Sequence, residues 1–454
     1  MEKLDILDIK KAYLVGIKGV GMTALARILK GLNIKVVGSD TKDKFFTDEV
    51  LKKQKIKFYE GFSHSNLKKE LPVDIVISSV AYLSQNSPYN PEIEFARKIS
   101  LPLMTYPEAL GNIFNQSFGI AICGSHGKSS TTAVLGKIFK EANLDPTVLV
   151  GSEIIEWKSN SLISKSFKKK LLFLKENEDK LNNLNWIKKN LINLPIFIIE
   201  ADEYKEAFLN YYPRIIILTN IDYDHPDYFK TEKEYKQSFK KFFKQLKEPK
   251  ILITKKNRIL NLKPFPFPFK GKHWQENLSL VYSLIKILGI KEKHFLKSIS
   301  TYKGIKRRFE IIKQKNEIVL IDDYAHHPTE VFAYYKSLKN HFSDYKIFFI
   351  FQPHTFTRTH FLFNEFLKTF KKIKNDKKIT FIIFKTFPSA REKETILKIK
   401  NLKTDKLLAK KLNTYFFEKE KDLIDFLNKN LLPKTVITTV GAGDVYKILE
   451  NINF

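Results

Sequence analysis

The stretch that most constrains the fold of this chain is Gly119–Phe139, which reads GIAICGSHGKSSTTAVLGKIF. It begins with an apolar run typical of a buried strand, and apolar residues at helical spacing resume from Ala133. A polar turn that contains two glycines joins the two patterns. This order predicts a strand, a tight loop and a helix in direct succession, which places backbone N–H groups and a helix N-terminus around an anion.

The loop in this stretch matches a shortened phosphate loop, GxxGKS, because the longer pattern needs a glycine where this chain has Ile122. Lys128 would supply a cation for the outer phosphates of a nucleotide, and the hydroxyl of Ser129 would bind Mg2+. We therefore expect ATP at this loop, with the candidate contacts Gly124, Ser125, His126, Gly127, Lys128, Ser129 and Ser130.

The length of 454 residues exceeds what one hydrophobic core normally holds and favours about three domains. A hydrophobic fraction of 43% with only 17 Gly and 17 Pro is typical of a folded chain. We expect no membrane span and no signal peptide, because no apolar block has the required length or flanks. The single cysteine, Cys123, suits a reducing compartment, so we expect a cytoplasmic protein.

The balance of charges is strongly basic, with 79 Lys and Arg against 49 Asp and Glu and a formal net charge of +30. A charge of this sign can attract nucleic acid, so a basic nucleic-acid-binding ATPase is a remote alternative. The lysines are spread through the whole chain, however, and are not gathered in one arm. We therefore expect neither nucleic acid nor a membrane as the partner.

The N-terminal segment has the pattern of a nucleotide-binding βαβ unit. Apolar runs predicted as strands flank a glycine turn, GIKGVG, and a helix that ends at Gly31, and Asp40 follows the second strand. An acid at that place can accept hydrogen bonds from ribose hydroxyls. The dinucleotide fingerprint GxGxxG is broken by Lys18, so a purely structural turn remains open, as does an NAD-dependent dehydrogenase on this turn alone.

Carboxylates follow two predicted strands of the middle segment. Glu200, Asp202 and Glu203 come directly after the apolar run Ile196–Ile199, where a magnesium ligand belongs beside a phosphate-loop strand. The next predicted strand, Arg214–Asn220, is followed by acids and a histidine at positions 222, 224, 225 and 227. We interpret His225 as a candidate metal ligand or phosphate contact.

The last third of the chain repeats an order of strand, polar residues and helix. Predicted strands at Lys346–Phe351, Ile379–Phe384 and Thr435–Val440 each precede polar residues. The run DDYAHHP, from Asp322 to Pro328, places two acids, a tyrosine and two histidines after another predicted strand. This order predicts a parallel sheet with ligands at its carboxyl edge.

Nine strings occur together in the order found in the Mur ligases: GSHGKSSTT, EADE, TNIDYDHPD, GKHWQEN, GIKRRF, DDYAHHPTE, FQPHTFTRT, AREKE and GAGD. The chain resembles that family from Gly16 to Asp444. The resemblance implies an α/β fold of three domains: an N-terminal Rossmann-like domain for a UDP-sugar (residues 1–116), a central phosphate-loop ATPase domain with a mostly parallel sheet (117–312), and a C-terminal Rossmann-like domain for the amino acid (313–454).

The resemblance also implies an activity. ATP would phosphorylate the lactyl carboxylate of UDP-N-acetylmuramate, and the amine of L-alanine would displace the phosphate to form an amide, as a step of peptidoglycan precursor synthesis. FQPHTFTRT and GAGD resemble the members that use alanine. The members that reattach a recycled tripeptide share EADEY and the DDYAHHPT string, so they are the alternative. The implied cofactors are ATP and Mg2+, and the implied state is a monomer or weak homodimer.

The resemblance assigns further roles to single residues. Lys128 would stabilise the transferring phosphoryl group, and Ser129, Glu200 and His225 would be metal ligands. Asn277 resembles the adenine contact, and Arg308 and Asp323 would complete the nucleotide site. Tyr324, His326 and Arg358 resemble the set that binds alanine, with Arg358 on its carboxylate. The residues expected to face the UDP-sugar are Gly19, Gly21, Ser39, Asp40, Ser78 and Ser79.

This chain also departs from the family pattern at several positions. Lys18 replaces a glycine of the UDP turn, Trp274 follows the histidine of GKHW where asparagine is typical, and Thr355 stands where some members carry arginine. A lysine-rich stretch from Ser161 to Asn193 reads as a helical insertion. None of these departures removes a residue that the chemistry needs.

Overall fold

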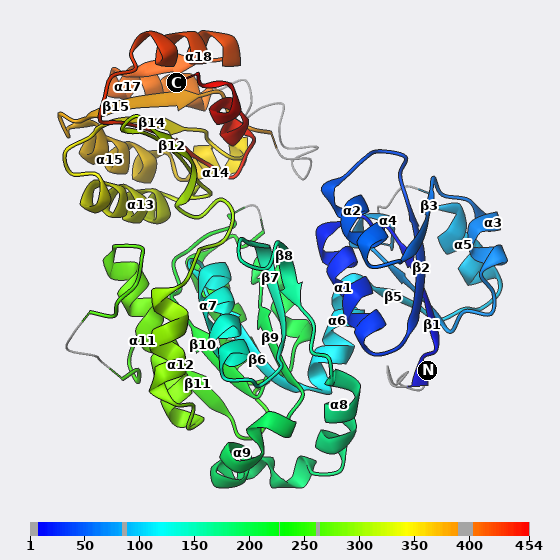
Figure 1. The fold of residues 1–454 in the computed structure, drawn as a ribbon. Helices are drawn as coiled ribbons and strands as arrows, with labels where there is room; N and C mark the ends of the chain where they lie inside the picture. Colours follow the sequence, from blue (N-terminus) through cyan, green and yellow to red (C-terminus); the bar gives the residue numbers. More distant parts are fainter. Residues whose placement is uncertain (1–7, 84–88, 227, 260–263, 389–402, 454) are drawn as a thin grey trace. The chain divides into compact units, whose positions relative to one another are not determined.

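The computed structural model describes residues 8–83, 89–226, 228–259, 264–388 and 403–453 (Figure 1). The string AREKE, which begins at Ala390, and the acid at position 227 lie outside the described residues. Three sheets with helices between their strands confirm the predicted α/β class. Contacts divide the chain into two compact units, one with the first two sheets and one with the third, and each is described by itself. No described helix combines the length and the apolar character that crossing a membrane requires.

The first sheet has the strand order β3-β2-β1-β4-β5, and all its pairs are parallel. This is the Rossmann order, 3-2-1-4-5-6, without its sixth strand. Val15, the last residue of β1, pairs with Ser39 on one side and Ser78 on the other, so the glycine turn leaves the sheet at the same edge as both serines. The elements are β1 (Lys11–Val15), α1 (Val20–Gly31), β2 (Lys35–Asp40), α2 (Phe46–Lys53), β3 (Lys57–Glu60), α3 (His64–Lys69), β4 (Ile75–Ser78), α4 (Val80–Leu83), α5 (Pro91–Lys98), β5 (Leu103–Thr105) and α6 (Tyr106–Asn115).

The second sheet has the order β11-β10-β6-β9-β7-β8 and is parallel except for the β7–β8 pair. Its central strand, β6, is fully buried and lies between β9 and β10, and α7 packs beside it (Figure 1). The elements are β6 (Phe118–Cys123), α7 (Lys128–Glu141), β7 (Thr147–Ile154), β8 (Ser159–Leu162), α8 (Phe167–Lys175), α9 (Leu184–Asn190), β9 (Ile196–Glu200), β10 (Ile215–Leu218), α10 (Glu232–Phe243), β11 (Ile251–Ile253), α11 (Lys272–Ile287) and α12 (Glu292–Ser300).

The sequence analysis predicted that the lysine-rich stretch is helical, but the structure shows that its start is not. Its first residues belong to β8, because the chain returns antiparallel to β7 and pairs Leu149 with Ser161. Two short helices follow, α8 and α9, and they bury about one apolar residue per turn. Most of their lysines are exposed, but Lys170 is buried and donates to the Leu144 carbonyl at 2.7 Å. Phe167, Leu171 and Ile187 are among the buried side chains, so this stretch extends the core of the first unit.

The third sheet has the order β12-β13-β17-β14-β15-β16, parallel except for the β12–β13 pair. The strands predicted at Lys346–Phe351, Ile379–Phe384 and Thr435–Val440 are confirmed residue for residue. This sheet begins at Glu310, three residues before the predicted domain boundary. Its elements are β12 (Glu310–Lys315), β13 (Ile318–Asp323), α13 (Pro328–His341), β14 (Lys346–Phe351), α14 (Phe356–Phe361), α15 (Phe363–Lys374), β15 (Ile379–Phe384), α17 (Thr404–Leu412), β16 (Tyr415–Phe417), α18 (Glu420–Lys429) and β17 (Thr435–Val440).

Candidate active site

The phosphate loop runs from the end of β6 to the start of α7. Gly124 adopts φ +128°, and a Cβ atom there would lie 2.2 Å from Thr219 Oγ1 and 2.7 Å from the Asn220 carbonyl oxygen. Gly127, with φ +80°, forms the N-cap of α7. Only glycine fits the first position without displacing the neighbouring strand end, and the second has the left-handed backbone that glycine favours. The loop is therefore shaped by the residues that follow β10.

Thr219 and Asn220 hold the loop through hydrogen bonds. The backbone N–H of His126 donates to Asn220 Oδ1 at 3.0 Å, and Thr219 Oγ1 donates to the His126 carbonyl at 2.7 Å. The Ser125 N–H donates to the Asn220 carbonyl at 3.2 Å. These two residues were not among the predicted contacts, although they lie in the string TNIDYDHPD. Their signal in the sequence was their place just after a buried strand.

Lys128 folds back over the loop. Its Nζ atom donates to the Gly124 carbonyl at 2.6 Å and forms an ion pair with Glu203, at 2.8 Å to Oε2 and 3.1 Å to Oε1. The Glu203 side chain is fully buried. Burial opposes the charge on Lys128, but the carboxylates of Glu203, Asp202 and Glu200 outweigh it and raise the lysine pKa, so the ammonium group stays charged. The sequence analysis named Glu203 only as one of three acids where a magnesium ligand belongs, and it did not predict the ion pair with Lys128.

Ser129 and Glu200 meet at the first turn of α7. Ser129 Oγ donates to Glu200 Oε1 at 2.9 Å, and the Gly151 N–H donates to Glu200 Oε2 at 2.7 Å. Burial raises the pKa of Glu200, against the effect of Lys128. A hydroxyl and a carboxylate oxygen this close are the ligand types that Mg2+ prefers, so the two predicted ligands fit the ion.

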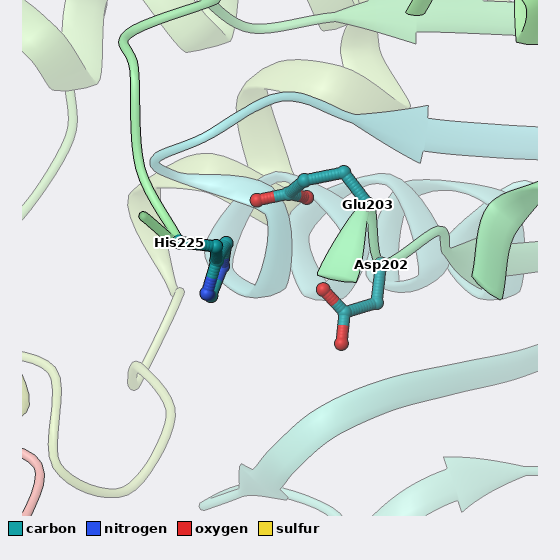
Figure 2. A group of neighbouring side chains, drawn as sticks. All are labelled: Asp202, Glu203 and His225. Atoms are coloured by element: carbon teal, nitrogen blue, oxygen red, sulfur yellow. The ribbon is translucent and has the colours of Figure 1, made fainter. Parts of the chain in front are cut away.

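A second group of possible ligands lies at the ends of β9 and β10. One ligand atom from each of Asp202, Glu203 and His225 lies within 4.8 Å of the others (Figure 2). His225 has φ +59°, a left-handed conformation that is uncommon outside glycine. The sequence analysis placed a magnesium ligand among Glu200, Asp202 and Glu203, but the resemblance assigned only Glu200 of these three, together with His225.

In the second unit, the residues predicted to bind the amino acid gather after β13 and β14. The His326 Nδ1 atom lies 2.9 Å from the Tyr324 carbonyl, and the two rings lie 5.4 Å apart. Arg358 is buried and donates to Asp224, with Nε and Nη2 each 3.2 Å from Oδ1. Burial alone would raise the pKa of Asp224, but Arg358 holds it well below its usual range. Arg358 is therefore paired with a carboxylate of the chain itself.

The residues predicted to complete the nucleotide site also lie in this unit. Asp323 accepts hydrogen bonds from the N–H groups of Phe309 and Ala325 at 2.8 and 2.9 Å, and burial raises its pKa to about 7. The guanidinium carbon of Arg308 lies 5.3 Å from the centre of the Tyr324 ring. Asn277 lies on the first turns of α11 and is half-buried. Their contact with adenine or phosphate stays a prediction.

The predicted UDP-sugar residues meet at the carboxyl edge of the first sheet. Gly16 packs against Ser79, and Gly21 packs against the Tyr106 ring. Gly19 is the N-cap residue of α1 and, as a glycine, has no side chain to accept hydrogen bonds from the first turn. The N-terminus of α1 therefore offers unpaired N–H groups to an anion. Two of the predicted residues also have partners within the sheet, since Ser39 Oγ donates to Glu92 and Ser78 Oγ donates to the Ser79 carbonyl.

Asp40 is held by the glycine turn itself. The Lys18 N–H donates to Asp40 Oδ2 at 2.6 Å, and the Thr41 N–H donates to Oδ1 at 2.8 Å. Burial raises the pKa of Asp40, and these two hydrogen bonds oppose that effect. Each carboxylate oxygen keeps a second lone pair for a further donor such as a ribose hydroxyl.

Glu203→Gln tests the buried ion pair. The substitution keeps the shape of the side chain but leaves the Lys128 ammonium without its partner, so we expect the free energy of unfolding to fall by roughly 2–3 kcal/mol. Glu156→Gln is the matched control, because Glu156 pairs at 2.6 Å with Lys137, which lies on the same helix as Lys128, but is 34% exposed, and the substitution should cost less than about 1 kcal/mol. Urea unfolding measures both variants. Equal losses would contradict the account of Lys128.

His326→Asn tests a pH dependence. Burial, with help from Arg358, lowers the pKa of His326 to about 3, whereas an unfolded histidine titrates near about 6.5. Between these values the unfolded chain binds a proton that the folded chain does not, so stability falls as the pH falls. The wild type should lose about 1.4 kcal/mol more per pH unit than the variant below pH ~6. Parallel curves from urea unfolding at several pH values would contradict this.

Comparison with known proteins places these features in a family. Models described as "Mur ligase family, catalytic domain", "Mur ligase middle domain" and "Mur ligase, glutamate ligase domain" match residues 11–118, 122–263 and 307–443. The UDP-N-acetylmuramate–L-alanine ligase of Borreliella burgdorferi is 32% identical over 97% of this chain and 98% of its own length. The enzyme of that name from Clostridium kluyveri is also 32% identical, over 98% of both chains.

Solved structures show the same fold. The UDP-N-acetylmuramate–alanine ligase of Thermotoga maritima superposes with a TM-score of 0.69 at 22% identity, covering 97% of both chains. A murein peptide ligase of Psychrobacter arcticus gives a TM-score of 0.64 at 19% identity, covering 98% of both. With family models along all three parts of the chain and relatives at 32% identity over nearly its full length, this chain belongs to the Mur ligase family.

Proposed function

We propose that this chain is an ATP-dependent ligase that joins L-alanine to the lactyl carboxylate of UDP-N-acetylmuramate, a step of peptidoglycan precursor synthesis. The observation that carries the proposal is the phosphate loop, in which Lys128 and the Ser129–Glu200 pair stand at the carboxyl edge of the central sheet. The curated relatives of nearly equal length bear the name of this activity, which supports the choice of substrates.

The first step transfers a phosphoryl group. An oxygen of the lactyl carboxylate attacks the γ-phosphorus of ATP, the bond to the bridging oxygen breaks, and ADP leaves, which gives an acyl phosphate. Loop N–H groups and the α7 N-terminus bind the phosphates, and Lys128 moves from Glu203 to neutralise the charge on the transferring group. Two Mg2+ ions, one held by Ser129 and Glu200 and a second by His225, would offset the negative charge of the triphosphate.

The second step forms the amide. The uncharged amine of alanine attacks the acyl carbon, and inorganic phosphate leaves from the tetrahedral intermediate. The low pKa of His326 keeps its imidazole neutral at pH 7, so it can accept a hydrogen bond from the amine. The alanine carboxylate would replace Asp224 on Arg358, because the guanidinium N–H groups that donate to Asp224 can donate to another carboxylate.

The other parts of the proposal follow from these substrates. The edge of the first sheet, with Gly19, Gly21, Asp40 and Ser79, would bind the UDP-sugar, and a cytoplasmic location would give access to ATP and UDP-N-acetylmuramate. A monomer or weak homodimer is part of the proposal. The ligase that adds a recycled tripeptide is the second candidate, because a murein peptide ligase shares the fold at a TM-score of 0.64.

A phosphate-release assay tests the function. We expect release of phosphate from ATP only when UDP-N-acetylmuramate, L-alanine and Mg2+ are all present. Phosphate leaves only when alanine attacks the acyl phosphate that the first step forms. The tripeptide L-alanyl-γ-D-glutamyl-diaminopimelate, supplied in place of alanine, is the control. Faster release with the tripeptide would favour the second candidate. Release at the same rate without either the sugar nucleotide or an amino acid would contradict the ligase assignment.

A further inference from the structure

Lys18 is a charged residue in the glycine turn whose side chain is fully buried. A lysine at this place in a nucleotide-binding turn is expected to extend towards a phosphate. Instead its Nζ atom donates to the carbonyls of Thr41 and Asp43 at 3.0 and 2.8 Å. Both acceptors lie in the loop between β2 and α2. The ammonium group therefore points into the protein and away from solvent.

The surroundings of the ammonium group compensate its burial. Asp48 Oδ2 lies 3.5 Å from Nζ, and the rings of Phe58 and Phe45 lie with their centres at 5.4 and 5.9 Å. Asp48 is itself buried. If the lysine turned out towards a ligand, the Asp48 charge and two carbonyl groups would lose their partner in a buried place, which is costly. The contacts thus favour one fixed position of the side chain.

The backbone of Lys18 is tied to the same segment. Its N–H donates to Asp40 Oδ2 at 2.6 Å, and its carbonyl accepts a hydrogen bond from Thr47 Oγ1 at 2.5 Å. One residue of the turn therefore contacts the segment from Asp40 to Asp48 through its N–H, its carbonyl and its ammonium group. Asp40, Thr47 and Asp48 of that segment are buried, whereas residues 42–45 between them are exposed.

We propose that Lys18 is a positioning residue of the sugar-nucleotide site, which fixes Asp40 and the following segment, residues 41–48, against the glycine turn and does not itself bind the diphosphate. The inference rests on the proposed function, in which Asp40 meets the ribose. A loop that is already ordered before the ligand arrives needs no further ordering on binding, which strengthens binding of the nucleoside part.

Lys18→Met tests this by comparing two ligands. Uridine carries the ribose without phosphate, whereas UDP carries the ribose and the diphosphate. The affinity of each ligand for the full-length protein is measured by displacement of UDP-N-acetylmuramate. We expect both to bind roughly tenfold more weakly or worse, by the same factor, because the shared ribose contact is lost. We expect the KM for UDP-N-acetylmuramate to rise with little change in the KM for ATP. Lys35→Met, at an exposed position on β2 of the same domain, should change none of these values.

Two results would overturn the inference. Weaker binding of UDP with unchanged uridine would mean that Lys18 contacts the phosphates, and unchanged binding of both would mean that it has no role in the site. Should Lys18→Met fold poorly, Lys18→Met with Asp48→Asn removes both buried charges and should still show the equal loss. Absence of ligase activity in the wild type would count against the proposed function instead, since the comparison of uridine with UDP needs no turnover.

Discussion

The close approach of Gly124 to the residues after β10 is the constraint on which the rest of the site depends. A Cβ atom at this position would overlap Thr219, so only glycine allows the sharp turn by which the chain passes from β6 to α7. The parallel neighbours β9 and β10 end at the same edge, so Glu200 and Glu203 reach the loop from one side and Asn220 from the other. The cation, the oxygen ligands and the loop N–H groups are brought together by sheet geometry.

Two lysines with little exposed surface differ in their partners in this chain of net charge +30. Lys128 is held by a carboxylate that a phosphate can replace, so under the proposed function its ion pair would hold it beside the transferring phosphoryl group. Lys18 is held chiefly by backbone carbonyls, which no ligand replaces, so we infer that its ammonium group stabilises the conformation of the turn. We therefore base the different roles proposed for the two lysines on the partners of each side chain and not on the residue type.

Local pattern was enough to predict the phosphate loop and the strands β14, β15 and β17, and to place carboxylates beside the loop, because parallel strands align their carboxyl ends. The choice of Glu200 as the partner of Ser129 came from the family resemblance. It could not predict which side chains pair across long stretches of sequence. The Lys128–Glu203, Arg358–Asp224 and Ser39–Glu92 contacts join residues 75, 134 and 53 positions apart. Such pairs depend on side-chain directions that neither periodicity nor motif spacing contains. The prediction of a helix at the start of the lysine-rich stretch was wrong for a similar reason, since β8 forms only through its pairing with β7.

Phosphate release by a Lys128→Met variant, measured with saturating UDP-N-acetylmuramate, L-alanine and MgATP, tests the account of this site most directly. Methionine keeps the length of the side chain and removes the charge, so the loop can keep its shape while the transferring phosphoryl group loses its cation. We predict that the variant folds and that its rate falls by at least about a hundredfold. A folded variant that releases phosphate at the wild-type rate would contradict the central role of Lys128.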